Sequence, residues 1–172
     1  CPDHVFLRRV HLDVTGTLPE PQEVVRFLEE GKAGKRAALI DRLLAGRAYA
    51  DCQAMRWSDL LRIKSEFPIN LWPNAAQAYY QYIWSALREN KPYDELAREL
   101  LTSSGSNFRV PPVNFYRAIQ APRPEAMARA AALTFMGVRA EKWTGTRLAG
   151  LAAFFSWVGF KRTAEWKEEV VF

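Results

Sequence analysis

Most of this chain repeats apolar residues every three to four positions, in runs that open near proline and close near glycine. This is the period of an α-helix, and proline in the first turn and glycine just after the last are common helix boundaries. The pattern predicts helices at 2–15, 19–31, 35–45, 48–64, 74–90, 92–101, 125–136 and 144–158. No segment alternates apolar and polar residues over a useful length. The predicted class is therefore all-α, an irregular array of about eight helices, with at most a short pair of strands at 170–172.

Each predicted helix has one apolar face, and these faces are expected to pack together as the core. Asn74 is expected to cap the helix at 74–90. Pro68 and Pro73 bracket residues 69–72, which predicts a stiff extended connection there. The residues expected to face inward are Val24, Val25, Phe27, Leu28, Met55, Trp57, Leu60, Leu61, Ala76, Tyr80, Ile83, Trp84, Leu87, Leu96 and Leu100.

The segment after the helix at 92–101 cannot continue that helix. Gly105, Pro111 and Pro112 interrupt the helical pattern, yet the neighbouring residues are too apolar for a solvated linker. An ordered loop is the natural interpretation. Ordered loops often carry function, although the residues of this one name no reaction.

Five polar residues are the ligand-binding candidates: Arg62, Lys64, Asn107, Arg109 and Asn114. Arginine offers a planar fork for carboxylate, phosphate or propionate groups, and a proline-stiffened loop holds such a side chain in place. The alternative is an internal role, in which Arg109 pairs with a buried acid or with helix-end carbonyls and fixes the loop. We favour the internal role, because the polar groups of an ordered loop need partners.

No catalytic or metal site is predicted. His4 and His11 lie on one helical face, but a zinc or haem site needs further ligands, so surface or core histidines are the preferred interpretation. Asp51 and Asp59 are interpreted as a solvated helix face. The serines around Gly105 lack the G-x-S-x-G pattern and a nearby histidine, which argues against a hydrolytic triad. Whether the chain is an enzyme stays open.

The charge and composition of the chain limit the kinds of partner that it is expected to bind. The chain has 172 residues and a net charge of +5, but no run of Lys and Arg, so nucleic acid is not an expected partner. No apolar stretch is long enough to span a bilayer. Cys1 and Cys52 form no Cys-x-x-Cys pair.

Because the chain opens without methionine, residues 1–172 are expected to form one helical domain of a larger protein. The 6 Trp and 10 Phe exceed what a minimal core needs, which places some aromatic residues at an interface or ligand site.

Several motifs follow one another in the order of a known family. They include Phe-Leu-Arg-Arg-Val-His-Leu-Asp-Val-Thr-Gly at 6–16, Leu-Pro at 18–19, and the segments 39–44, 57–62, 90–94 and 150–155. In this respect the chain resembles the planctomycete cytochrome-c-associated family of unknown function. The resemblance implies a large exported protein, periplasmic or extracellular, with a haem-c domain before this one and another uncharacterised domain after it. It also implies a role in the breakdown of complex carbohydrates, but it carries no catalytic residue across.

The chain departs from that family after Gly137. The family has a Cys-x-x-Cys-His stretch there, which is the signature of covalent c-type haem. In this chain Arg139 runs directly into Ala140, so no haem is placed on its residues. We expect a break in the structure between Arg139 and Ala140, with the Cys-x-x-Cys-His segment present in the parent protein.

Three functional hypotheses follow. The first is a helical domain of an exported haem-associated protein that supports electron transfer or oxidative carbohydrate breakdown. The second is a non-catalytic interaction module that docks neighbouring domains or a polysaccharide. The third is a hydrolase or lyase with an Arg and carboxylate site. Soret absorption of the full-length protein distinguishes the first hypothesis, and saccharide binding without turnover distinguishes the second.

Overall fold

The computed structural model describes residues 1–66 and 71–172, and these are mostly helical, as predicted. The α-helices are α1 Asp3–Thr15, α2 Pro21–Glu29, α3 Lys35–Leu44, α4 Arg47–Leu61, α5 Pro73–Arg88, α6 Tyr93–Thr102, α7 Asn114–Arg117, α8 Pro124–Met136 and α9 Gly145–Ala153. Two short 3-10 helices, η1 Pro111–Val113 and η2 Ala140–Lys142, lie in the connections. The connection expected at residues 69–72 falls partly outside the described residues.

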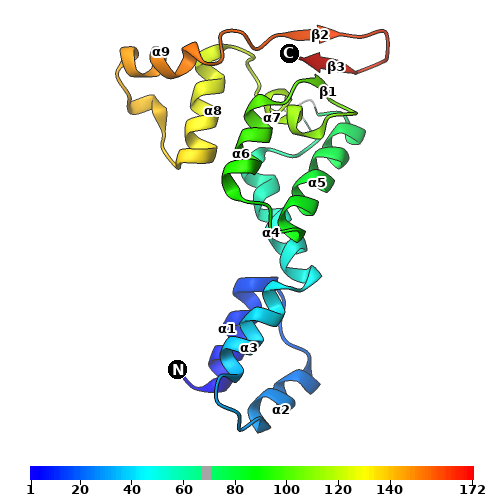
Figure 1. The fold of residues 1–172 in the computed structure, drawn as a ribbon, viewed down its shortest axis with the longest axis vertical. Coiled ribbons are helices and arrows are strands. Elements are labelled where there is room, and N and C mark those ends of the chain that lie inside the picture. Colours follow the sequence, from blue (N-terminus) through cyan, green and yellow to red (C-terminus); the bar gives the residue numbers. More distant parts are fainter. Residues whose placement is uncertain (67–70) are drawn as a thin grey trace.

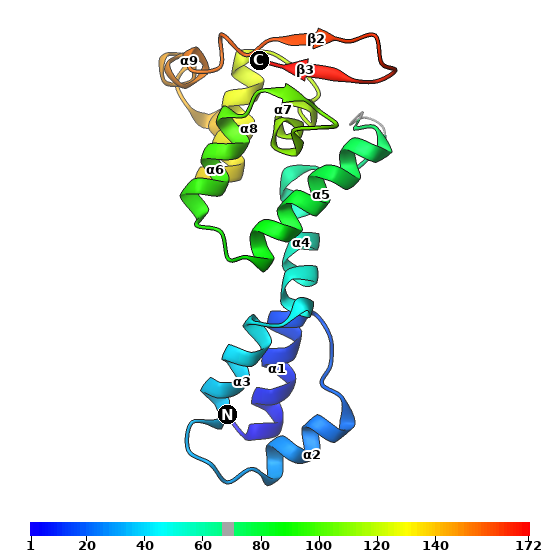
Figure 2. The ribbon, with the colours of Figure 1, turned by 45° about the vertical axis from the view of Figure 1, so that its right-hand side comes forward.

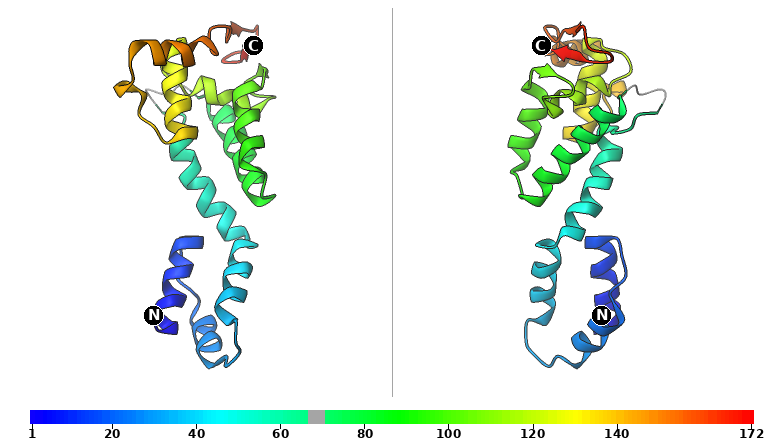
Figure 3. Two further views of the ribbon diagram at one scale, coloured as in Figure 1. Left: turned by 60° about the vertical axis from the view of Figure 1, so that its left-hand side comes forward. Right: turned by 90° about the vertical axis from the view of Figure 1, so that its right-hand side faces the viewer.

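The helices gather at two ends of an elongated molecule (Figures 1 and 2). Helices α1, α2 and α3 surround a small core of Leu7, Val10, Phe27 and Leu39. Helices α5 to α9 contribute to a larger core at the other end. Helix α4 runs from one group to the other and packs against both α1 and α5 (Figure 3). The single domain expected from the sequence stays a prediction.

The end of α1 is fixed where it meets α4. Gly16 has φ 72, a left-handed conformation that favours glycine, and a Cβ there would lie 3.1 Å from the Cys52 sulfur. At the other end of α1, Asp3 accepts from Lys35 at 2.6 Å and from Arg36 at 2.7 Å. Those two side chains hold the pKa of Asp3 below its usual value. The contact at Gly16 therefore packs the end of α1 against α4, and the ion pairs of Asp3 hold its start against α3.

The chain also contains a small antiparallel sheet. Strand β3 Glu169–Val171 lies between β1 Gly105–Ser106 and β2 Phe160–Arg162. A short strand near 170–172 was expected, but its pairing with the loop after α6 was not. This sheet ties the end of the chain to its middle, where Figure 1 shows it above α7. Among the described residues, no helix combines the length and the apolar character needed to cross a membrane.

Helix α6 is attached to α5 by a small polar group. Tyr82 donates a hydrogen bond to Glu99, and the Lys91 ammonium lies 2.7 Å from the same carboxylate. The Lys91 contact, followed by the Tyr82 hydrogen bond, lowers the pKa of Glu99, while burial and that same bond raise the pKa of Tyr82. The carboxylate is therefore ionised and fully engaged at neutral pH.

Several side chains predicted to face inward are exposed, which corrects the sequence analysis. Val25, Leu28, Met55 and Leu60 are 55%, 46%, 62% and 40% exposed. Val25 and Leu28 lie on the short helix α2, and Met55 and Leu60 on α4. Each lies at the margin of its helix's apolar stripe, which the partner helices leave uncovered.

The buried face of α5 is also displaced from the predicted stripe. Its buried residues are Ala75, Tyr79, Ile83 and Ala86, so that Ile83 alone belongs to both sets. Trp84 is half-buried, because its indole N–H donates to Asp51 Oδ1 at 2.7 Å and this holds the ring at the edge of the core.

Three helix boundaries differ from the predicted ones. Proline takes the first position of α5, with Trp72 before it, so Asn74 lies inside the first turn and does not cap the helix. Helix α4 ends at Leu61 because Arg62 adopts a left-handed conformation with φ 58. Helix α9 ends at Ala153, well before Val158.

We predict that Ile83→Ala lowers the free energy of unfolding by roughly 2–5 kcal/mol, because it opens a cavity in the larger core. Ile83 is fully buried. The matched control is Met55→Ala on the exposed side of α4, with an expected change of about 0.5 kcal/mol or less. Urea titration followed by circular dichroism measures both. Equal losses for the two variants contradict this assignment of the core.

Candidate functional site

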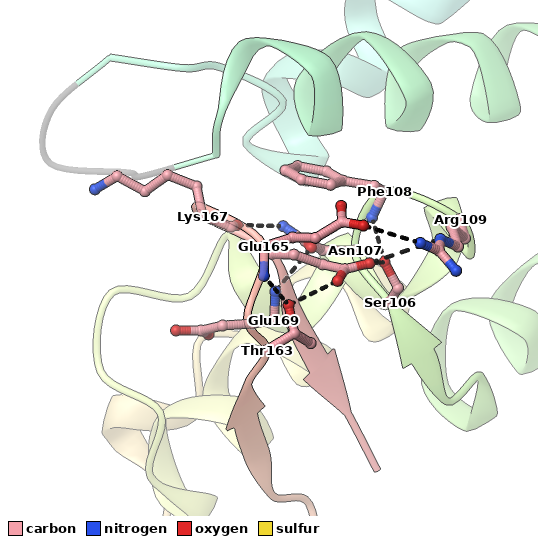
Figure 4. A network of polar contacts seen from close by, with 9 residues as sticks. Ser106, Asn107, Phe108, Arg109, Thr163, Glu165, Lys167 and Glu169 are labelled. Atoms are coloured by element: carbon pink, nitrogen blue, oxygen red, sulfur yellow. Dashed lines mark hydrogen bonds and ion pairs between the residues drawn. The ribbon is translucent and has the colours of Figure 1, made fainter.

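The loop after α6 is joined to the C-terminal hairpin by one asparagine (Figure 4). The Asn107 backbone N–H donates to the Glu169 carbonyl at 3.0 Å, and its Oδ1 accepts from the Glu169 N–H at 3.0 Å. Its Nδ2 lies 3.4 Å from the Lys167 carbonyl. Asn107 therefore continues the pairing of β1 with β3 through its side chain, which explains why a polar residue is buried here.

A second buried asparagine holds the loop from inside. Asn114, the first residue of α7, donates from Nδ2 to the carbonyl oxygens of Asn107 at 2.8 Å and Pro111 at 3.0 Å. Gly105 completes the loop, with φ 136 and a virtual Cβ 2.7 Å from Val110, so a larger residue does not fit. The loop is ordered, as predicted.

Glu168 is the buried carboxylate of the hairpin. Ser106 donates to one of its oxygens, and Thr163 donates to the other at 2.7 Å. Arg109 Nε lies 3.8 Å away. The Ser106 bond, then the Thr163 bond and the Arg109 charge, lower the pKa of Glu168. This carboxylate is ionised and saturated with donors, so it is suited to hold the hairpin and poorly suited to donate a proton.

A cavity of about 570 Å³ opens beside this network. Its walls are formed by the hairpin, by Arg117 of α7, by the two residues just before α5 and by Ser65 after α4. Its lining residues are Ser65, Leu71, Trp72, Arg117, Arg162, Thr163, Ala164, Glu165, Trp166, Lys167, Glu168 and Glu169.

An aromatic pair stands at this cavity. The rings of Trp72 and Trp166 meet edge to face with centroids 4.5 Å apart. Trp166 is 71% exposed. The Lys167 ammonium lies 5.9 Å from the Trp72 centroid and 5.6 Å from that of Trp166. Such distances allow cation–π attraction, which holds the ammonium near both rings.

Two arginines of the cavity share one acid. Arg117 Nη1 lies 2.8 Å from Glu169 Oε2, and Arg162 Nε lies 3.7 Å from Glu169 Oε1. Arg117 Nε is buried and has no hydrogen-bond partner among the described residues. The protein itself therefore leaves donors of both guanidinium groups unused.

The structure brings together three of the five predicted ligand-binding candidates. Asn107, Arg109 and Asn114 lie in one loop, where Arg109 faces Glu165 at 3.4 Å and the buried Glu168. This is the internal role favoured from the sequence. Arg62 lies apart at the end of α4, and Lys64 lines a separate cavity beside α4 and α5. A ligand-binding role for these five residues stays a prediction.

Sequence reasoning missed the residues that line the larger cavity. Trp72, Arg117 and the hairpin residues Arg162 and Trp166 come from three separate segments with no shared motif. The only signal was the surplus of aromatic residues, which suggested a ligand site without locating it.

The histidines and the paired carboxylates occupy ordinary positions. His4 is exposed, and His11 is buried with Nε2 3.4 Å from Glu23 Oε2. Asp51 and Asp59 are exposed on α4, as the solvated-face interpretation expected. Within residues 1–66 and 71–172, no three His, Cys, Asp or Glu side chains gather closely enough to hold a metal ion.

The expected break at Arg139 is not present in this chain. Arg139 has φ −80 and ψ 104 and leads directly into η2, which begins at Ala140. The residues of η2 suffice to join α8 to α9, so the expectation of a gap in the structure was wrong. A Cys-x-x-Cys-His segment in the parent protein stays a prediction, because the structure tests this chain alone.

Residues 1–149 match the PSCyt2 family, described as a protein of unknown function (DUF1549). The chain belongs to this family. The match supports the resemblance as far as a family of unknown function. No curated protein and no solved structure matches the chain. The match stops before β2 and β3, so the family assignment rests on the helical part and not on the hairpin of the cavity.

We predict that Glu168 makes stability depend on pH. Its folded-state pKa is lower than the ordinary 4.5, so the unfolded chain binds more protons between the two values. The stabilisation is present above the ordinary pKa and is lost as pH falls through the lowered one. Tm should therefore drop less in Glu168→Gln than in the unsubstituted protein between about pH 6 and about pH 3.

The matched control for this pH series is Glu141→Gln, on an exposed glutamate of η2. It should keep the pH dependence of the unsubstituted protein. An unchanged dependence in Glu168→Gln argues that this carboxylate is not a site of acid destabilisation.

We also predict that two substitutions of Asn114 lower the free energy of unfolding to different extents. Asn114→Ala leaves two carbonyls without their donor and should cost about 1–3 kcal/mol. Asn114→Asp keeps the shape but points carboxylate oxygens at the same carbonyls, so it should cost more than Asn114→Ala at neutral pH. Urea titration measures both free energies of unfolding. A stable Asn114→Asp variant contradicts the assigned hydrogen bonds.

Proposed function

We propose that this chain is a non-catalytic binding module, and that the cavity of its C-terminal hairpin holds a segment of a saccharide chain. The observation that carries this proposal is the Trp72 and Trp166 pair at the cavity. An edge-to-face pair covers a face of one ring only, so aromatic surface remains for a ligand. Sugar rings present apolar C–H faces that pack against such a surface.

The size of the cavity favours a polymer segment over a neighbouring domain. Pockets for small ligands measure about 300–1,000 Å³, and this cavity holds about 570 Å³. Docking of a domain uses a broader surface, commonly about 800 Å² on each partner. A concave site with two indole rings and several charged groups fits a few sugar units.

The acids of the cavity support binding rather than proton transfer. Glu168 is held ionised by Ser106 and Thr163. Glu165 and Glu169 are paired with Arg109 and with two other arginines. A general acid needs a pKa near the working pH, whereas the hydrogen bonds from Ser106 and Thr163 lower the pKa of Glu168.

Binding to a panel of neutral and acidic oligosaccharides tests the proposal, with tryptophan fluorescence as the signal. Trp166→Ala should weaken the binding of the best ligand by about tenfold, because loss of an aromatic contact costs on the order of 1 kcal/mol or more. The matched control is Trp157→Ala, which removes another exposed indole outside the cavity lining. It should leave binding unchanged.

Chromatography of the same oligosaccharides after incubation should show no cleavage. Turnover abolished by substitutions at Arg109 or Glu168 favours the hydrolase or lyase hypothesis instead. Absence of binding to every saccharide, or equal loss in both tryptophan variants, overturns the proposed function.

We further propose the setting of the parent protein, on the resemblance alone. The parent is a planctomycete-type exported protein, periplasmic or extracellular, whose neighbouring domain carries haem c for electron transfer or oxidative carbohydrate breakdown. The residues of this chain do not fit a haem-c site. The sequence lacks Cys-x-x-Cys-His, and Cys52 is buried against Gly16. Soret absorption is therefore expected from the parent protein and not from this chain, and a parent without it contradicts the haem setting.

A further inference from the structure

We propose that the saccharide bound in this cavity is acidic. Its oxyanion lies against Arg117 and Arg162 while its ring packs on the aromatic pair. This inference rests on the proposed function and adds the chemical class of the ligand. It is drawn from the charges of the cavity, the unused donors of its arginines and the position of its indole rings.

The charges of the cavity leave a positive excess beside Glu169. Arg109, outside the lining, stands near both Glu165 and Glu168 and offsets much of their charge. Glu169 is then the only acid of the lining that faces Arg117 and Arg162. Lys167 adds a third cation and makes no ion pair among the described residues. Three cations against one carboxylate leave this side of the cavity positive, and a negative group on the ligand offsets part of that excess.

The arginines have donors available for that group. A guanidinium has five N–H donors, and a carboxylate accepts two of them in parallel. Arg162 is 91% exposed, and its 3.7 Å separation from Glu169 is too long for a hydrogen bond. Arg117 engages Glu169 through Nη1 and leaves Nε without a partner among the described residues. Both side chains lie at the same carboxylate, Arg117 at Oε2 and Arg162 at Oε1. The donors open to a ligand are those of the exposed Arg162, since Arg117 Nε is buried.

The aromatic pair and the cations together define the ligand. Lys167 lies within 6 Å of both tryptophan centroids, so positive charge and aromatic surface adjoin. A ligand that uses both needs an apolar face beside a negative group. A sugar ring that carries a carboxylate has this combination, and a ring that carries a sulfate shares the same oxyanion chemistry. A neutral sugar engages the indoles but leaves the cations without a partner.

Three probes separate these possibilities by isothermal titration of the whole chain. They are tetragalacturonate, its methyl ester and a sulfated galactose tetramer. The methyl ester keeps the rings and removes the charge. We expect it to bind about tenfold more weakly than tetragalacturonate, the effect of one charge-assisted hydrogen bond. The sulfated tetramer shows whether any oxyanion suffices or the carboxylate is selected.

Variants locate the charge recognition. Arg162→Gln and Lys167→Gln should each reduce the preference for tetragalacturonate over its ester by several-fold, since each removes one cation of the cavity. Arg162 is almost wholly exposed, so its substitution leaves the core intact. Arg129→Gln, on an exposed arginine of α8 outside the cavity lining, is the matched control and should keep the preference. Added salt should weaken tetragalacturonate binding and leave the ester unaffected.

The outcomes distinguish this inference from the proposed function. If the ester binds as tightly as the acid and Trp166→Ala still weakens both, the acidic ligand is wrong and the saccharide module stands. If both cavity variants keep the full preference for the acid, the assigned oxyanion site is wrong. If no probe and no other oligosaccharide binds, both proposals are overturned.

Discussion

The pairing of the Gly105 to Asn107 segment with the C-terminal strand is the contact on which the rest of this site depends. It joins residues about sixty positions apart through the backbone and side chain of Asn107. Closing so long a loop costs conformational entropy, and a two-residue strand gives few hydrogen bonds in return. The added bonds of Glu168 to Ser106 and Thr163 explain how so short a sheet holds. The cavity exists because the hairpin is fastened at this point.

The helical scaffold positions the remaining wall of the cavity. Helix α5 begins at Pro73, and the residue before proline is held in an extended conformation, which directs Trp72 toward the hairpin. Arg117 comes from α7, whose first residue Asn114 is locked to the same loop. Three segments distant in sequence thus meet through local rules of helix starts and buried hydrogen bonds. Helix α4 connects this assembly with the separate core of α1, α2 and α3.

The helices were predictable from the sequence because their signals are local. Proline starts, glycine stops and the 3.6-residue period place nearly every helix within a few residues of its observed bounds. The helical faces were less predictable. In α5 aromatic residues occur on adjacent stripes, and only the tertiary partner decides that Tyr79 is buried while Trp84 lies at the edge with Asp51. The left-handed Arg62 that ends α4 likewise has no local signature.

The candidate site was only partly predictable, for the same reason. Asn107, Arg109 and Asn114 share one loop, so their common role could be inferred from a single stretch of sequence. Arg162 and Trp166 reach the cavity only because β3 pairs with β1, and a strand of three residues leaves almost no pattern. Long-range pairing between such short segments is decided by the fit of individual side chains. A sequence pattern cannot express that fit.

The polar groups around the hairpin differ in how fully they are paired within the protein. Glu168 and Asn107 have hydrogen bonds inside the protein, and Asn114 donates to two carbonyls while its Oδ1 has no partner among the described residues. Beside the cavity Arg117 Nε is unpaired and the Lys167 ammonium, which makes no ion pair among the described residues, lies near two indole rings. Under the proposed function, a ligand that contacts both the hairpin and the segment before α5 strengthens by mass action the long-range pairing that forms its own site.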